Sequence, residues 1–459
     1  MANPNPNQDA VYDVKSLGTG KTLVLGVQHL FAMFGATVLV PAITGLNVST
    51  TLLFAGLGTL LFHLITGRKV PAFLGSSFAF LGGYAAIAPT VDAAGNAINN
   101  AALLPYACAG VAVAGLIYLV LAGLFKGFGA QKVMRFFPPI VTGPIIICIG
   151  LTLAKSAIDN CNTNWLVALV AIAVVVVANI WGKGMVKIVP ILLGVVASYL
   201  FALIVDPSAR ANVMATVAAA DWIGLPIIWK NTAFSIFGEG FDGGLLVTAI
   251  VTIAPISLAT MVEHVGDICA ISSTVGKNYV ADPGLHRTLM GDGLATALAA
   301  LFGAPANTTY GENTGVLALS KVYDPKVVRL AALFAIVLSF CPKFAALIVA
   351  MPVATMGGVS LVLYGMISAV GVRNVVENQV DFTKSRNVLI AALIMGLAIG
   401  VNYAGAIVIP VGAITISLSG LAVAAIVGIA MNAILPGKDY EFGVNQQGDT
   451  SVNFGTRHD

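Results

Sequence analysis

The stretch TTYGENTG, residues 308–315, places a single carboxylate, Glu312, inside an otherwise apolar segment of membrane length. An ionisable side chain at the centre of a bilayer costs roughly 3 kcal/mol or more, and it therefore indicates a functional site. The glycines and hydroxyl residues around it interrupt a helix, and backbone groups freed at that depth persist only where they line a cavity or are buried in protein. The stretch predicts a polar ligand site in the middle of a membrane.

The composition of the whole chain fits this prediction. Of its 459 residues, 58% are hydrophobic and only 9% are charged, whereas soluble domains carry about 25% charged residues. Apolar stretches recur from about residue 22 to about residue 436, which indicates a polytopic α-helical protein in a lipid bilayer. The net charge of +3 gives no indication of nucleic-acid binding.

The ends of the chain and the cysteines carry no further signal. Residues 1–21 and 437–459 are polar, and we expect two short cytoplasmic tails without a cleavable signal peptide. The five cysteines lack C-x-x-C spacing, so neither a disulfide, a metal site nor a cofactor is expected.

Apolar segments predict about fourteen spans and an all-α polytopic fold. Their approximate limits are 22–41, 50–66, 72–89, 102–125, 136–154, 164–181, 188–205, 244–270, 288–303, 306–320, 328–341, 344–370, 388–403 and 410–436. The longest insert, 206–243, is expected to be an extracytoplasmic connection, and Cys161 is expected in a loop.

The basic residues support an even number of spans. With fourteen spans and both termini in the cytoplasm, 19 of the 23 Lys and Arg residues fall on the cytoplasmic side. The other side receives only Lys155, Arg210, Lys230 and Lys343. Because cytoplasmic loops are enriched in Lys and Arg, this asymmetry favours both termini in the cytoplasm.

The two halves of the chain resemble each other at three places. The matching segments are PAFLGSSF at 71–78 and PANTTY at 305–310, QH at 28–29 and EH at 263–264, and PPIVTG at 138–143 and PVATMG at 352–357. Seven spans per half is an odd number, so the second half would be inverted in the membrane. Inverted repeats with interrupted, paired segments are typical of secondary transporters; chance similarity between apolar segments is the alternative.

Few acidic residues fall in the apolar spans. Glu263 and Asp267 are four residues apart and share one face of a helix. Two carboxylates that close repel each other, and the pair favours holding one proton between them, as proton-coupled transport requires. The alternative is a structural pair satisfied by hydroxyls or helix termini. For Asp292, which follows a glycine near the start of the ninth span, we favour an orienting role.

The two interrupted segments together match the chemistry of a nucleobase. The N–H groups of Phe78 and Gly311 and the carboxylates of Glu263 and Glu312 would meet adjacent C=O and N–H groups of a ligand. Phe78 and Tyr310 would cover a flat ring, although ordinary interior packing explains aromatic side chains equally well.

Histidines within the spans allow two interpretations. His29 and His264 could relay protons, or each could be a buried neutral residue that joins two elements. No P-loop, H-E-x-x-H or G-x-S-x-G motif occurs, which argues against an ATP-driven pump and against a membrane hydrolase.

Four motifs resemble the nucleobase–ascorbate transporter family, also known as nucleobase:cation symporter-2, and within it bacterial uracil permeases. They are QHLFAMFGAT at 28–37, GSSFAF at 75–80, EHVG at 263–266 and NTTYGENTG at 307–315. The family signature that starts with Glu or Gln followed by Asn matches residues 312–321, and glutamate at its first position is typical of uracil carriers.

The resemblance implies a fold of two inverted seven-span repeats in which spans 3 and 10 contain short antiparallel strands. It implies a dimer whose core domain moves against a gate domain in an elevator-like step. The core would comprise residues 22–125 (spans 1–4) and 244–343 (spans 8–11), and the gate residues 126–205 (spans 5–7) and 344–436 (spans 12–14).

The resemblance also implies symport of uracil and protons across the bacterial cytoplasmic membrane. The substrate-binding residues would be Phe78, Glu263, Gly311, Glu312, Tyr310 and Ala36. From the carboxylate pair and the histidines described above, the proton-coupling residues would be Glu263, Asp267, His29 and His264.

One departure from the family pattern bears on the mechanism. The close uracil permeases carry a histidine where this chain has Asp267, and an aspartate there resembles the purine branch. A purine such as xanthine or urate is therefore the alternative substrate, and an anion transporter of the same architecture is a more distant one. No enzymatic activity is expected.

Overall fold

The computed structural model describes residues 10–90, 98–238, 240–411, 414–438 and 440. For residues 185, 188, 312, 319, 410–411 and 414–417 it describes the backbone alone. Most of the two expected tails and the side chain of Glu312 therefore lie outside the described part.

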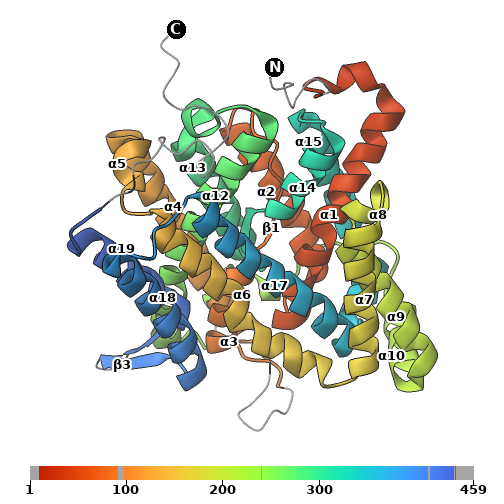
Figure 1. Cartoon of the computed structure of the whole chain (residues 1–459). Coiled ribbons are helices and arrows are strands. Elements are labelled where there is room, and N and C mark those ends of the chain that lie inside the picture. The colour runs from red at the N-terminus through yellow and green to blue at the C-terminus, as the bar shows by residue number, and fades with distance from the viewer. Residues whose placement is uncertain (1–9, 91–97, 239, 412–413, 439, 441–459) are drawn as a thin grey trace.

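Long apolar helices dominate the described part of the chain (Figure 1). Seven helical stretches are long and apolar enough to cross a membrane, and there are up to nine if each of two bent pairs counts as one span. The seven are α1 (Thr19–Thr44), α2 (Val48–Ile65), α4 (Leu104–Phe128), α6 (Pro139–Cys161), Gly243–Val275, α17 (Val353–Glu377) and α18 (Ser385–Ala404). The bent pairs are α9 (Pro190–Val205) with α10 (Pro207–Ala219), at 113°, and α15 (Pro325–Ser339) with α16 (Pro342–Val349), at 88°.

The remaining elements are shorter. The stretch Gly243–Val275 consists of α11 (Gly243–Ile253), η5 (Ala254–Ile256) and α12 (Ser257–Val275). The other helices are α3 (Leu81–Ile87), α5 (Ala130–Met134), α7 (Trp165–Trp181), α8 (Met185–Ile188), α13 (Leu285–Leu301), α14 (Gly311–Ser320) and α19 (Gly420–Ile434). The 3₁₀ and π turns are η1 (Val14–Leu17), η2 (Phe78–Phe80), η3 (Trp229–Asn231), η4 (Ala233–Ile236) and η6 (Val280–Gly284), and the strands are β1 (Leu74–Ser76), β2 (Asn307–Thr309), β3 (Ile407–Val411) and β4 (Ile414–Leu418).

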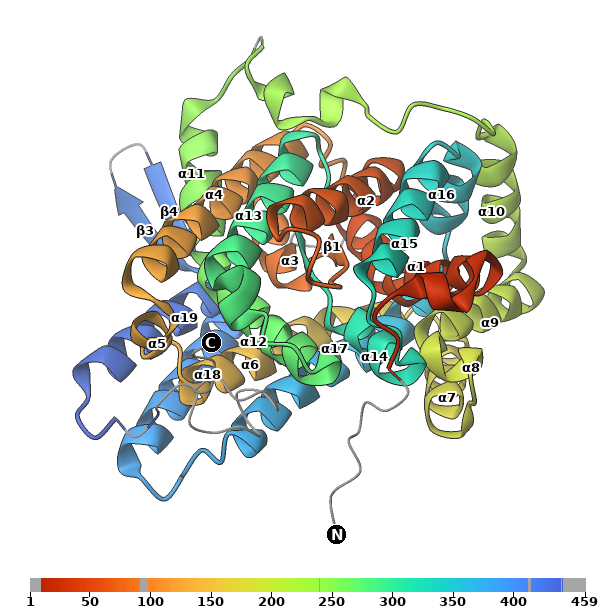
Figure 2. The ribbon, with the colours of Figure 1, turned by 90° about the horizontal axis from the view of Figure 1, so that it is seen from above.

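The two interrupted segments meet as a two-stranded antiparallel sheet inside the bundle (Figure 2). Leu74 lies opposite Thr309, and Ser76 lies opposite Asn307. Gly75 has room for no side chain, because a Cβ there would lie 2.5 Å from the ring of Tyr310. Each strand is followed by a helical segment, η2 and α3 after β1 and α14 after β2, so both helical segments begin at the same place in the fold.

Polar side chains satisfy the backbone groups that point away from this small sheet. The Leu74 N–H donates to Thr59 Oγ1 at 2.9 Å, and the Thr309 N–H donates to Asp292 Oδ1 at 2.9 Å. The Asn307 carbonyl accepts from Thr296 Oγ1 at 2.9 Å. Because the strand pair is buried, α2 and α13 must supply the hydrogen-bond partners that an isolated strand pair lacks.

Glycines allow the helices of the two halves to approach closely. A Cβ on Gly115 of α4 would lie 2.6 Å from the carbonyl of Gly293 on α13, and one on Gly371 of α17 would lie 2.6 Å from Ile147 N on α6. Gly56 of α2 meets α15 in the same way, 2.5 Å from the carbonyl of Ala332. Small residues at helix crossings are typical of membrane proteins, where close backbone contact replaces the hydrophobic driving force.

Part of the expected last span is not helical. The sequence predicts a helix over 410–436, whereas Ile407–Val411 and Ile414–Leu418 form the antiparallel strands β3 and β4, and α19 begins at Gly420. Ile407, Val408 and Ile409 are β-branched and favour extended backbone, and Pro410 lacks the N–H that a helix needs. The prediction of a fully all-α span was therefore wrong in this segment.

The connection 206–243 contains the helix α10, whose N-terminus is capped by Asp206, and its extracytoplasmic location stays a prediction. Two further segments differ from the prediction. Cys161 is the last, buried residue of α6 rather than a loop residue. The expected span 344–370 is two helices, because Met351-Pro352 separates α16 from α17 and a proline disfavours helical backbone in the residue before it.

Candidate functional site

A cavity of about 500 Å³ lies where the two interrupted segments, α12, α6 and α17 meet. Glu263 and Asp267 of α12 and Thr309 of β2 supply polar groups to its wall. The facing wall from α6 and α17 is apolar at Ile146, Ile149, Leu363, Met366 and Ile367, and it also carries Thr142, Arg373, Asn374 and Glu377. An apolar cavity with a few converging polar groups is the common form of a small-molecule site.

Two helical segments begin at this cavity. The segment Phe78–Ile87 starts after Ser77, and α14 starts at Gly311 after Tyr310. In neither case does the side chain of the N-cap residue bond to the helix, so first-turn N–H groups are available to a ligand. The backbone of Gly311 lies beside Asp267: a Cβ there would make an ordinary contact of 3.4 Å with Asp267 Oδ1.

The predicted carboxylates fall into two groups. Glu263 and Asp267 both line the cavity. Asp267 Oδ2 accepts a hydrogen bond of 3.1 Å from the hydroxyl of Thr309. Glu312 is the second residue of α14, directly after cavity-lining Gly311, and its side chain lies outside the described part. Among the described residues no cluster of three or more His, Cys, Asp or Glu side chains could hold a metal ion.

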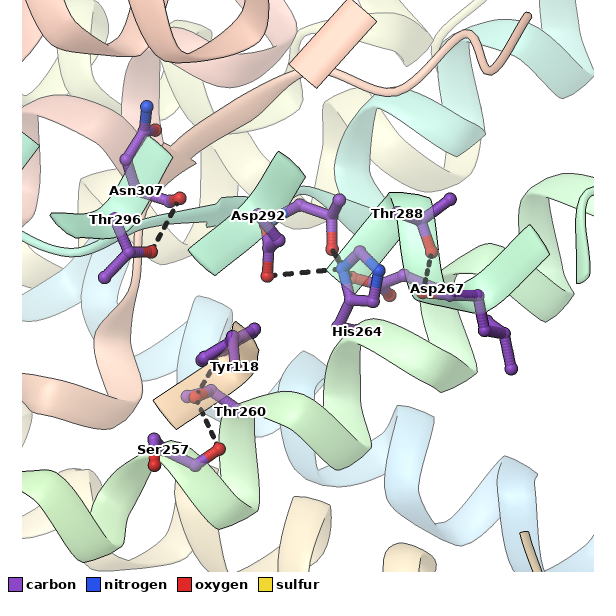
Figure 3. A network of polar contacts seen from close by, with 11 residues as sticks. Tyr118, Ser257, Thr260, His264, Asp267, Thr288, Asp292, Thr296 and Asn307 are labelled. Atoms are coloured by element: carbon purple, nitrogen blue, oxygen red, sulfur yellow. Dashed lines mark hydrogen bonds and ion pairs between the residues drawn. The ribbon is translucent and has the colours of Figure 1, made fainter. Parts of the chain in front are cut away.

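A buried polar network connects Asp267 with Asp292 (Figure 3). Nδ1 of His264 lies 3.2 Å from Thr309 Oγ1 and 3.2 Å from Asp292 Oδ2. The side chains of His264 and Asp292 are completely buried. The contacts run from the cavity wall at Asp267 through Thr309 and His264 to Asp292, and they fix β2 against α12 and α13.

The aromatic side chains at the cavity are held by different contacts. Tyr310 donates its hydroxyl proton to the Ser76 carbonyl at 2.9 Å, and Thr37 Oγ1 lies 3.2 Å from the same hydroxyl. The ring of Phe78 packs edge-on against Tyr364, with 5.6 Å between the ring centroids. Both rings are therefore fixed before any ligand binds.

Besides His264, which lies behind the wall in the buried network, two predicted residues lie apart from the residues that form the cavity wall. Ala36 is buried in α1 beside Thr37 and is not among the described residues that line the cavity. His29 is also buried in α1, and Asn313 Nδ2 lies 3.1 Å from its Nδ1 and 3.2 Å from its carbonyl oxygen. His29 thus joins α1 to α14, and the roles expected for both residues stay predictions.

The residues that hold the site in place were largely missed by the sequence analysis. Thr59, Thr296 and Thr37 serve the backbone or side chains of the interrupted segments from distant helices. A threonine within an apolar helix gives little signal of its own, because its hydroxyl can also bond to the helix backbone. The repeated pairs of hydroxyl residues, Ser76-Ser77 and Thr308-Thr309, were the available indication that hydrogen bonds concentrate here.

Comparison with known sequences gives close matches over nearly the whole chain. The profile of the Permease family (Xan_ur_permease) matches residues 20–407. The uracil permease of Bacillus caldolyticus is 40% identical over 443 residues, which cover 93% of this chain and 95% of that protein. The uracil permease of Escherichia coli (strain K12) is 38% identical over 430 residues, which cover 90% of this chain and 91% of that protein.

Comparison with solved structures gives distant relatives of the same fold. The transmembrane domain of the cyanobacterial bicarbonate transporter BicA matches with a TM-score of 0.56 at 16% identity, covering 84% of this chain and 96% of that chain. The structure of SLC26A9 matches with a TM-score of 0.61 at 14% identity, covering 92% of this chain and 66% of that chain. At these identities the likeness shows a shared fold and no shared substrate.

Proposed function

This chain belongs to the Permease family, and we propose that it imports uracil together with protons across a bacterial cytoplasmic membrane. The family match makes it a transporter of the nucleobase–ascorbate type and not an enzyme. The observation that supports the substrate best is the meeting of Glu263, Phe78 and Gly311 at one cavity. Relatives at 38–40% identity that are named uracil permeases support the same substrate.

Uracil suits the groups that line this cavity. Its ring N–H groups would donate to the carboxylates of Glu263 and Glu312. Its carbonyl oxygens would accept from first-turn N–H groups of the two helical segments that begin at Phe78 and Gly311. The planar ring would lie near the aromatic side chains of Phe78 and Tyr310. Because other contacts already hold both side chains in place, uracil binding would cost little further side-chain entropy.

In this proposal the coupling proton is shared by Glu263 and Asp267. The two carboxylates are one helical turn apart on α12 and line the same cavity, so protonation of one lowers their repulsion. The Thr309 hydroxyl donates to Asp267, and this bond connects the carboxylate pair to β2. A protonated Glu263 would present a different hydrogen-bonding edge to the base, and this difference couples proton binding to substrate binding.

Alternating access would follow from motion between the two walls of the cavity. One wall comes from the interrupted segments and α12, and the other comes from α6 and α17. We propose that the first belongs to a moving core (22–125 and 244–343) and the second to a gate (126–205 and 344–436) that forms the dimer contact. This arrangement supposes fourteen spans in two inverted repeats, with both termini in the cytoplasm.

A purine is the second candidate substrate. Asp267 supports it, because this position resembles the purine branch and its carboxylate lies on the cavity wall. An anion is a weaker candidate in spite of the fold shared with bicarbonate transporter BicA. The carboxylates of Glu263 and Asp267 on the wall would repel an anion, and the basic residue that α17 contributes to the lining, Arg373, forms an ion pair with Glu377.

Uptake of labelled uracil into proteoliposomes with an imposed pH gradient tests the proposal. We expect accumulation that depends on the gradient and is blocked by excess unlabelled uracil, while xanthine and urate compete weakly. Glu263→Gln should abolish uptake in a protein that still unfolds at the temperature of the wild type. Strong competition by xanthine would instead assign a purine, and accumulation unaffected by collapse of the pH gradient would disprove proton coupling.

A further inference from the structure

The helices α5, α18 and α19 lie near one another (Figure 2). A second cavity, of about 430 Å³, is lined by residues on and beside these helices, near the described end of the chain. Four basic side chains line it: Lys132, Arg135, Arg386 and Lys438. The other lining residues are Gln131, Pro138, Ile140, Asn432 and Tyr440. No acidic side chain lines it among the described residues, and within that part of the chain none of the four cations forms an ion pair.

Hydrogen bonds hold the Arg386 side chain in place, and no acidic side chain among the described residues pairs with its charge. Its Nη2 donates to the side-chain oxygen of Asn432 at 2.7 Å and to the Asn432 carbonyl at 3.1 Å. Its Nε–H is buried and has no hydrogen-bond partner among the described atoms. Asn432 in turn donates to the Arg135 carbonyl at 2.9 Å. A positioned guanidinium with a spare buried donor, beside three more cations, fits an anion with several acceptor oxygens.

We propose that this cavity binds a phosphate-bearing anion, and that the anion is the headgroup of an acidic membrane phospholipid. Exposed apolar side chains border the basic ones: Phe136 follows Arg135 and is 48% exposed, and Ile434 at the end of α19 is 76% exposed. A lipid would place its phosphate among the cations and its acyl chains along such surfaces, whereas a soluble phosphate would leave them uncovered. Basic pockets between membrane helices are a known form of site for acidic headgroups.

The position of the cavity links the bound lipid to transport. The helix α5 stands between α4 and α6, which are assigned above to the core and to the gate. Tyr440 lines both this cavity and the proposed substrate cavity. A bound headgroup would therefore hold the segment that connects the two moving parts. The binding site itself does not depend on the identity of the transported substrate.

Native mass spectrometry of the purified full chain tests the site with phosphatidylglycerol, phosphatidylcholine and inorganic phosphate as probes. The test variant is Lys132→Gln/Arg135→Gln, because both side chains are exposed and the Arg135 carbonyl that Asn432 needs is retained. The matched control is Lys183→Gln/Lys187→Gln, which removes the same charge from residues that do not line the described cavity. Arg386→Gln is a second variant, and its loss of the contacts to Asn432 could unfold it.

We expect the wild type and the control to retain phosphatidylglycerol in preference to phosphatidylcholine. The test variant should bind it about 25-fold more weakly, which corresponds to roughly 1 kcal/mol for each of two basic residues. Inorganic phosphate could instead raise the unfolding temperature of the wild type while the protein shows no preference between the two lipids. That result would support an anion site but overturn the lipid as its ligand. Equal binding of phosphatidylglycerol by the test variant and the control would overturn the site.

Discussion

The two interrupted segments are built alike but are anchored by different chemistry. Leu74 and Thr309 face each other in the strand pair, and the N–H of each points away from it. On the first strand a neutral hydroxyl, Thr59 Oγ1, accepts the Leu74 N–H; on the second a carboxylate, Asp292 Oδ1, accepts the Thr309 N–H. An acceptor for the outward-pointing N–H is thus supplied by a neutral hydroxyl on the first strand and by an ionisable carboxylate on the second.

This difference separates a passive half of the site from a titratable half. Beyond Thr59, the described anchors of β1 include the uncharged residues Thr37 and Tyr310. The anchor of β2 continues through His264 to Asp267 on the cavity wall. If protons drive transport, their effect on the two interrupted segments should pass through β2 and α14, while β1 stays in place.

Removal of the charged anchor should have the largest effect. Asp292→Ala leaves the buried Thr309 N–H and His264 without their acceptor, which costs about 1–3 kcal/mol for the N–H alone. We expect a lower midpoint of thermal unfolding in detergent and loss of uracil uptake in proteoliposomes. The variant Asp292→Thr gives β2 the same kind of anchor as β1, and it should recover most of the stability without recovering proton-driven uptake. Full activity of Asp292→Thr would remove the distinction between the halves.

The second largest effect is expected at the cavity end of the same network. Asp267→Asn keeps an oxygen that can accept from Thr309 but cannot share a proton with Glu263 as a carboxylate does. Uptake at saturating uracil should fall about tenfold, a loss of about 1.4 kcal/mol in transition-state stabilisation, and its dependence on pH should flatten. The measurement is the initial rate of uptake over a range of pH, with Asp381→Asn, an exposed loop residue, as the control. A pH profile that matches the wild type would exclude Asp267 from proton coupling.

The sequence predicted the interrupted segments better than it predicted what holds them. Glycines, hydroxyls and a carboxylate in residues 308–315 indicated a broken span, and the similar residues 71–78 indicated its partner. The register that pairs Leu74 with Thr309 depends on how whole helices pack, which no local pattern contains. Thr59 and Thr296 could not be distinguished from ordinary helix residues, because their partners lie 15 and 11 residues away in the chain.

Apolar β-branched segments were the other limit of prediction. Residues 407–418 are as apolar as a membrane helix, and hydropathy alone does not distinguish a helix from the β3–β4 strand pair. Of the proposed site residues, Phe78, Glu263, Asp267, Gly311 and Tyr310 were found on one cavity wall. Ala36 came from the family resemblance and His29 from its place within an apolar span, and neither is among the described residues that line the cavity.

Loss of the Thr59 hydroxyl, the neutral anchor of β1, should lower stability less than loss of Asp292. It should lower stability more than loss of the Thr296 hydroxyl, which donates to a carbonyl of β2. Thr59→Val removes the acceptor of the Leu74 N–H, and Thr296→Val removes only a donor to the Asn307 carbonyl. Orphaned buried N–H groups are rarer in proteins than under-satisfied carbonyls, which indicates that they are less tolerated. We expect Thr59→Val to lower stability by about 1 kcal/mol and Thr296→Val by clearly less. Thermal unfolding of the two variants side by side provides the comparison, and the reverse order would show that the hydroxyl at position 59 is not a structural acceptor.

The smallest effect is expected for the hydrogen bond between the Tyr310 side chain and the backbone of β1. The hydroxyl of Tyr310 donates to the Ser76 carbonyl, so it connects α14 to the end of β1 without any charged group. Hydrogen bonds between membrane segments contribute about 0.6 kcal/mol on average, so Tyr310→Phe should weaken uracil binding about threefold and leave the pH profile unchanged. Tyr199→Phe is the matched control, because it removes a similar bond of 2.9 Å to the carbonyl of Leu347, away from the cavity. If Tyr310→Phe altered the pH profile as Asp267→Asn is expected to, then β1 would take part in proton coupling, and the separation into a passive and a titratable half would fail.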